Sequence, residues 1–283
     1  MTAGTSRAPA RSPAHAPSAS SPLWRATRAR IGDELRMFWR EPAAVGFTLL
    51  FPIILLVLFG SMFSGAVAGT SVSYSQVYVA GIVGSALMSV GFMSLAIGIT
   101  VEREAGMLKR LAGTPMPKAA YFLGKIGRVL ILGVIEVVLL CAIGVVMFDL
   151  RLPTEPGRWI TFLWVFGLGS AAATLLGLAV GGMISSAKAA PAILNVPFVV
   201  LQFISGVFVP DRMLPDSLQT ISAAFPLRWI CKGLRSVFLP DSFLTAEASG
   251  SWQHGTMAAM LIGWCVIGAL LATRTFRWVG RER

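Results

Sequence analysis

Segment 102–125 gathers charged side chains whose types and spacing suit charge pairing with a soluble partner. Glu102 and Glu104 lie at its start, and Lys109 and Arg110 follow within two helical turns. The segment is polar and strongly basic, and long apolar stretches flank it on both sides, so it cannot lie in hydrocarbon. We therefore expect a compact aqueous platform that membrane helices hold at both ends, where a soluble partner can apply force.

A single carboxylate, Glu136, falls near the middle of a predicted membrane span, where a charge costs about 2.5–3.5 kcal/mol. It should therefore face the interior of the bundle, a water-filled cavity or a partner. One interpretation places it in a substrate path, where it attracts a cationic amphiphile. The other makes it a hydrogen-bonded packing residue between helices. Asn195 and Gln202 are weaker polar markers of the same candidate path, and their amides also suit hydrogen bonds between helices.

Residue patterns for catalysis are missing from the sequence. Gly124-Lys125 lacks the upstream glycine and the following Ser/Thr of a phosphate-binding loop, and no G-x-S-x-G motif occurs. The two histidines are His15 and His254, and the three cysteines have no metal-ligand spacing. The sequence predicts a chain that is not an enzyme and that carries no cofactor or metal of its own.

The overall composition is that of a membrane protein. Apolar residues make up 55% of the 283 residues, charged residues only 13%, and the mean hydropathy is +0.73. A soluble domain carries about 25% charged residues, and several apolar runs approach or exceed the roughly 20 residues that cross a bilayer. We predict an all-α polytopic membrane protein with six transmembrane helices. The predicted spans are 43–64, 77–101, 129–148, 159–184, 191–209 and 255–273.

The N-terminal part of the chain precedes these spans. Residues 1–22 are rich in Ala, Ser and Pro and contain no apolar run, which predicts a disordered cytoplasmic tail. The membrane domain then covers 23–283. Residues 23–40 have apolar positions on one face and arginines among the polar positions, which predicts a helix on the cytoplasmic membrane surface. A solvated helix that packs on a partner is the alternative.

Lysine and arginine are distributed unequally between the two sides of the membrane. With the N-terminus inside, 18 of the 24 Lys/Arg residues fall on the cytoplasmic side, so both termini should be cytoplasmic. This bias also explains the net charge of +11 without a nucleic-acid partner. On the outer side, 211–239 predicts two short amphipathic helices at the interface, with Arg228, Lys232 and Arg235 on a polar face. Whether they re-enter the membrane is open, and an ordinary folded loop is the alternative.

Two motifs resemble those of a known family. The first is Glu102-Arg-Glu-x-Gly106-x-Leu108-Lys109-Arg110-Leu111-x-x-Thr114-Pro115, continuing to Tyr121 and Gly124-Lys125. The second is Ser205-Gly-Val-Phe-Val-Pro210, followed by Leu214-Pro215, Pro226 and Arg235. Together with the six spans, they make the chain resemble the type-2 ABC-transporter permeases, which export drugs, lipids and polysaccharides. The closest likeness is to the daunorubicin-resistance permeases of bacteria.

The resemblance implies a membrane subunit of an ATP-driven exporter in the bacterial plasma membrane, with a drug or antibiotic as substrate. Two separate ABC ATP-binding subunits would hold ATP and Mg, and a second permease subunit, identical or homologous, would complete the complex among membrane lipids. An exporter of a lipid or glycan precursor is one alternative. A membrane scaffold that shares the topology without transport is another.

In this family a short coupling helix after the second span docks into a groove of the ATPase. The resemblance assigns that role here to Glu102, Arg103, Glu104, Gly106, Leu108, Lys109, Arg110, Leu111, Thr114 and Pro115. A helix over 102–112 would carry Glu102 and Glu104 in its first turn and Lys109 and Arg110 near its end, as the helix dipole prefers. Leu108 and Leu111 would then anchor in an apolar notch of the partner.

Overall fold

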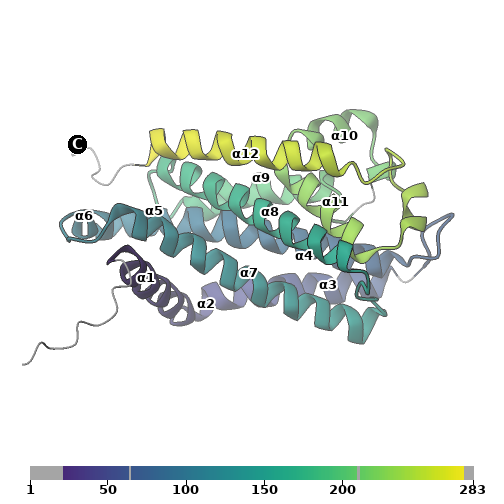
Figure 1. The fold of residues 1–283 in the computed structure, drawn as a ribbon, viewed down its shortest axis with the longest axis horizontal. Coiled ribbons are helices and arrows are strands. Elements are labelled where there is room, and N and C mark those ends of the chain that lie inside the picture. Colours follow the sequence, from purple (N-terminus) through teal and green to yellow (C-terminus); the bar gives the residue numbers. More distant parts are fainter. Residues whose placement is uncertain (1–21, 64, 209–210, 277–283) are drawn as a thin grey trace, which may run out of the picture.

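The computed structural model describes residues 22–63, 65–208 and 211–276, whose regular structure is helical. The tail predicted over 1–22 lies, up to residue 21, outside the described residues. Five helices are long and apolar enough to cross a membrane, and they run side by side along the molecule (Figure 1). They are Pro42–Met62, Tyr74–Glu104, α7 (Lys118–Phe148), α8 (Pro156–Met183) and α12 (His254–Thr275).

The first two of these helices each contain a π-helical turn. Such turns insert one residue into the helical ladder and occur often at functional sites. The first helix consists of α2 (Pro42–Val45), the π-turn η1 (Gly46–Leu50) and α3 (Phe51–Met62). The second consists of α4 (Tyr74–Met88), the π-turn η2 (Ser89–Ser94) and α5 (Leu95–Glu104). The two π-turns contact each other inside the bundle.

The fifth predicted span is shorter than expected. Helix α9 runs over Ala190–Ile204, and at about 1.5 Å per residue its 15 residues reach only about 22 Å, against a hydrocarbon core of about 30 Å. It ends because Gly206 adopts a left-handed conformation (φ 79°), which turns the chain back. A six-span topology therefore stays a prediction, whereas five long helices are present among the described residues.

Helix α1 (Pro22–Trp39) packs along α7 at one end of the bundle (Figure 1). Arg25, Arg28 and Arg36 lie on its exposed side, as the sequence pattern indicates, and Arg40 is exposed in the turn that follows the helix. Its location on a membrane surface stays a prediction. The short helix α6 (Met107–Ala112) lies at the same end of the molecule.

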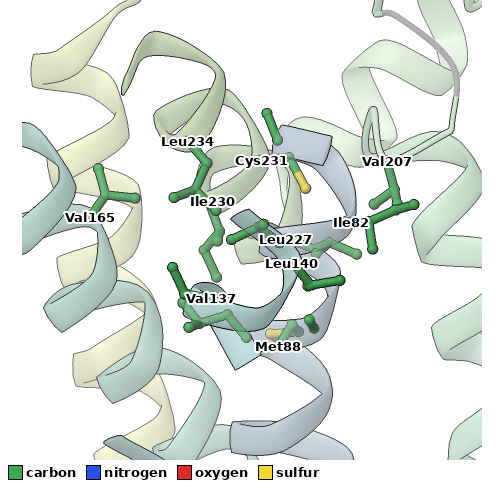
Figure 2. Close-up of a cluster of buried hydrophobic side chains, with 14 of the residues drawn as sticks. Ile82, Met88, Val137, Leu140, Val165, Val207, Leu227, Ile230, Cys231 and Leu234 are labelled. Carbon is green, nitrogen blue, oxygen red and sulfur yellow. The ribbon is translucent and has the colours of Figure 1, made fainter. Parts of the chain in front are cut away.

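The segment predicted as two interfacial helices is in part a core element. It contains the short turn η3 (Asp211–Met213), α10 (Asp216–Ala223) and α11 (Pro226–Phe238), and the turn η4 (Asp241–Thr245) follows. Helix α11 packs against both α4 and α8 and is almost wholly buried. Figure 2 shows side chains of α11, including Leu227, Ile230 and Leu234, in one apolar cluster with residues of α4 and α7.

Consequently, the predicted polar face of α11 does not face water. Lys232 and Arg235 are buried, and Arg235 Nε donates a hydrogen bond of 2.8 Å to Glu247 Oε1. Lys232 Nζ donates hydrogen bonds of 2.7 Å to Ser249 and to Gln253. The polar face expected on α11 is thus covered at Lys232 and Arg235, because the segment that follows α11 supplies partners for these two cations.

Close approach between α8 and the second long helix depends on glycine. A methyl group at Gly177 would lie 2.6 Å from the carbonyl oxygen of Gly91, and one at Gly181 would lie 2.8 Å from that of Ala96. Two helices can approach this closely only where side chains are absent. The Gly177-x-x-x-Gly181 pair therefore serves packing within this chain.

Candidate functional site

The three consecutive residues Glu102, Arg103 and Glu104 bind three different parts of the bundle. The phenol of Tyr121 in α7 donates a 2.8 Å hydrogen bond to Glu102 Oε2. Arg103 Nη1 donates to the carbonyl oxygens of Gly181 (3.3 Å) and Gly182 (2.8 Å), which lie in the last turn of α8. The amide of residue 187, in the link between α8 and α9, donates a 2.7 Å hydrogen bond to Glu104 Oε2. We refer to residues 102–104 as the clamp.

Beneath the clamp lies a buried ion cluster formed by Arg30, Glu34, Glu102, Lys125 and Arg128. Lys125 is at its centre and is 0% exposed; its Nζ pairs with Glu102 and lies 2.8 Å from Glu34 Oε1. Arg30 Nη2 lies 2.6 Å from Glu34 Oε1 and 3.5 Å from Glu102 Oε1. Arg128 lies 3.6 Å from Glu34 Oε2. The ion cluster thus joins α1, α5 and α7 through charges that no single helix could satisfy alone.

The electrostatics of the ion cluster favour the ionised form of Glu34. Burial alone would raise the pKa of Glu34, but Lys125, Arg30 and Arg128 outweigh burial and hold that pKa below its ordinary value of 4.5. Because the pKa is depressed, the stabilisation by Glu34 is fully present above about pH 4.5 and is lost as the pH falls through the folded-state pKa. Glu34 is therefore ionised at neutral pH.

Helix α6 extends from the clamp and presents a basic surface. Gly106 precedes it in the left-handed conformation (φ 70°), which lets the chain leave α5 and start a new helix. Lys109, Arg110, Thr114 and Pro115 are exposed, and Leu111 is half-buried. Thr114 Oγ1 donates a 2.7 Å hydrogen bond to the carbonyl oxygen of Leu111, which closes the last turn. We call residues 109–115 the α6 face.

This geometry corrects the single helix predicted over 102–112. The chain is broken at Gly106, so Glu102 and Glu104 belong to the last turn of α5 and not to the first turn of α6. Leu108 is only 2% exposed, so it anchors α6 on its own subunit and is not available to a partner's notch. The residues assigned to coupling therefore divide into the clamp, the α6 face, and two residues between them: Gly106, which forms the turn, and Leu108, which is buried.

The structure brings together two of the three residues predicted for a substrate path. Asn195 and Gln202 of α9 both line a cavity of about 170 Å³ between α9 and the two π-turns. Glu136 of α7 does not line this cavity. It is 1% exposed, and both of its carboxyl oxygens lack a hydrogen-bond partner among the described residues.

Sequence reasoning missed three members of the ion cluster, Arg30, Glu34 and Arg128, and it included Lys125 in the first motif without assigning it a role. A signal was present: Arg30 and Glu34 are four residues apart on the side of α1 that also carries the apolar Phe38. Charges at such positions are rarely buried unless they are paired. Lys125 and Arg128, three residues apart at the start of an apolar helix, supply the partners.

Comparison with known proteins decides the family. A sequence profile described as ABC-2 type transporter matches residues 26–239, which is most of the chain. The chain belongs to the ABC-2 type transporter family. The match includes α1 from residue 26 onward, the clamp, α6 and α11, so the residues of the candidate site lie within the ABC-2 domain.

Two relatives of this ABC-2 chain are described as transport permeases. The protein ycf38 of Porphyra purpurea is 24% identical over 251 residues, which cover 84% of each chain. YvfS of Bacillus subtilis (strain 168) is 23% identical over 194 residues, which cover 68% of this chain and 77% of YvfS. The ABC-2 chain is therefore a multi-pass transport permease, and ABC-2 permeases work with ABC ATP-binding subunits.

Proposed function

We propose that this permease is the membrane subunit of an ATP-driven exporter that moves an amphipathic molecule, a drug or antibiotic, outward across the bacterial plasma membrane. Two ATP-binding subunits would bring ATP and Mg, and two permease subunits would enclose the path. Both termini of the chain would be cytoplasmic, and so would α6. A lipid or glycan precursor as substrate would make use of the same machinery.

The observation that carries this proposal is the exposed α6 face directly after the clamp. Lys109 and Arg110 are exposed beside Thr114 and Pro115, whereas Leu108 fixes the helix to the bundle from below. An acidic groove on a soluble partner would complement this surface. A push on α6 would pass through the clamp to α7, α1 and the end of α8, because each of these elements bonds to residues 102–104.

The proposal is tested by reconstitution with an ABC ATPase, starting with any encoded in the adjacent reading frame. We expect the permease to co-purify with that ATPase, and proteoliposomes of the complex to move an amphipathic fluorescent substrate only with ATP. The permease alone should hydrolyse no ATP. ATP turnover by the isolated permease, or ATP-independent transport by it, would contradict the proposal.

Glu136 is buried and makes no hydrogen bond with a described residue, so the contact expected of a packing residue is not seen within the described part of the chain. An isosteric change separates a role in packing from a role in the substrate path. We expect Glu136→Gln to leave ATP-driven export within about twofold of the wild type, because the change keeps the side chain's size and removes a carboxylate that is costly in hydrocarbon. The measurement is the initial rate of export of one cationic and one neutral dye. A loss confined to the cationic dye would instead place Glu136 in the substrate path.

A further inference from the structure

Helices α7 and α8 leave an apolar groove between them near their ends farthest from α6, which Figure 1 shows at the opposite end of the molecule. The groove has a volume of about 540 Å³, and none of its lining side chains is charged. One wall belongs to α7, and the other consists of Trp159 and Phe162 of α8 with Phe238 at the end of α11. We call this site the α7/α8 groove.

Both walls of the α7/α8 groove are held in place. The α7 wall is made mainly of β-branched side chains, which keep one preferred rotamer in a helix and so do not turn to fill the space. They are Val134, Val137, Val138, Val145 and Val146. On the α8 wall, Trp159 Nε1 donates a 2.8 Å hydrogen bond to the carbonyl oxygen of Pro153. The Trp159 ring lies edge-on to Phe162, with 5.8 Å between ring centroids, and Phe162 stacks on Phe166. The groove is therefore preformed.

The length of the groove matches one lipid acyl chain. From Val134 to Val146, α7 rises about 18 Å at about 1.5 Å per residue. The hydrocarbon of one leaflet is about 15 Å thick, half of the roughly 30 Å core. Lipid chains are as apolar as leucine, so van der Waals contact is what distinguishes one apolar surface from another in a membrane. A concave groove contacts a chain on more sides than a convex helix does, and each added contact is attractive.

An uncompensated cation lies beside the outer end of the groove. Leu152 lines this end, and Arg151, directly before it, is exposed and has no ion pair or hydrogen bond with a described residue. By contrast, Arg158 Nε lies 3.4 Å from Glu155 Oε2. Asp149 lines a separate pocket on another side of α7. An anionic headgroup would therefore complement the charge at Arg151.

We propose that the α7/α8 groove binds one acyl chain of an anionic phospholipid, whose phosphate pairs with Arg151. The chain would contact α7, α8 and the end of α11 at once, because Phe238 is the last residue of α11. Arg158 of α8 already joins these elements through a 3.3 Å hydrogen bond to the carbonyl oxygen of Ser236. A bound lipid would stabilise this packing, since a ligand that binds the folded state shifts the equilibrium toward it. The inference does not depend on what the permease transports.

The test titrates the full-length permease in detergent with dipalmitoylphosphatidylglycerol, while native mass spectra count the bound lipids. Dipalmitoylphosphatidylethanolamine has the same chains and phosphate, but its ammonium group offsets the negative charge. We expect saturable binding of one phosphatidylglycerol, about fivefold tighter than phosphatidylethanolamine, as for one cation near a headgroup. Arg151→Gln should lose this preference, and Arg151→Lys should keep it because the charge remains. No saturable binding, or equal binding of the two lipids by the wild type, would overturn the proposal.

Variants that fill the groove locate the binding. Val138→Trp and Ala142→Phe each add bulk to the lining and should weaken phosphatidylglycerol binding at least tenfold. Val266→Trp is the matched control: Val266 is 53% exposed on α12, Val138 is 60% exposed, and Val266 lies outside the groove. The control should bind like the wild type. Wild-type binding by both groove variants, or an equal loss in the control, would contradict the assignment.

Two further readouts separate a lipid from other occupants. Phosphatidylglycerol should raise the apparent unfolding temperature of the wild type and of Val266→Trp, but not that of Val138→Trp. Without lipid the three proteins should unfold at similar temperatures, because both valines are exposed. The same mass spectra report the number of permease chains. If Val138→Trp lost a dimer that the wild type and Val266→Trp form, the groove would be covered by a second copy, and the lipid proposal would be wrong.

Discussion

Reversal of the two cations of the α6 face, in the variant Lys109→Glu/Arg110→Glu, should abolish coupling between ATP turnover and transport. Both side chains are exposed on the helix that we propose as the docking element, and Leu108 beneath them is untouched. Loss of one charged partner in a docked interface costs about 2–5 kcal/mol. We therefore expect at least about a 30-fold fall in substrate-stimulated ATP turnover and loss of ATPase co-purification, while membrane insertion is unaffected.

A matched control separates docking from general charge effects. Arg25→Glu/Lys188→Glu also reverses two exposed cations, one on α1 and one in the link between α8 and α9. The permease with this control pair of substitutions should still co-purify with the ATPase, and the complex should still show substrate-stimulated ATP turnover. If transport and ATP turnover survive reversal at α6, or if the control loses them equally, the α6 face is not the docking site.

Removal of the central cation of the ion cluster, in Lys125→Met, should destabilise the permease by about 3–5 kcal/mol. Glu34 and Glu102 would remain buried opposite each other with the central cation gone. The apparent unfolding temperature in detergent and the hydrogen exchange of α1 measure the effect. We expect a lower unfolding temperature and faster exchange along α1, because Lys125 joins α7 to that helix.

Two further variants make this prediction specific. Adding Glu102→Gln to Lys125→Met removes one of the stranded carboxylates and should restore part of the lost stability, with a coupling of about 1–3 kcal/mol. Lys188→Met changes an exposed lysine in the link between α8 and α9 and should stay within about 0.5 kcal/mol of the wild type. If Lys125→Met behaves like Lys188→Met, the ion cluster contributes no stability.

Local patterns in the sequence predicted the long helices well. Apolar length and few charges mark Tyr74–Glu104 and Pro156–Met183, and the structure differs from the predicted spans mainly at their ends. Helix α7 begins eleven residues before its predicted start at 129, because Tyr121 and Lys125 are polar residues with buried partners. A hydropathy scale excludes these two polar residues from the predicted span. The structure includes them in the helix because their polar groups have partners on α5 and α1.

The partners of buried charges could not be predicted from local patterns. Glu102 and Arg103 are neighbours in sequence, yet one bonds to α7 and the other to the end of α8. Arg235 similarly pairs with Glu247 across a turn. An amphipathic pattern states which residues are polar but not which element covers them, and that depends on the packing of distant segments.

The clamp has a mechanical consequence. Residues 102–104 are consecutive in the chain and are hydrogen-bonded to separate parts of the bundle. A displacement of the chain at Gly106 would therefore be transmitted to all of these contacts. Helix α1, the first turns of α7 and the last turn of α8 would then move together. Opening and closing of the pathway would follow as a single concerted step, and not as a succession of independent helix movements.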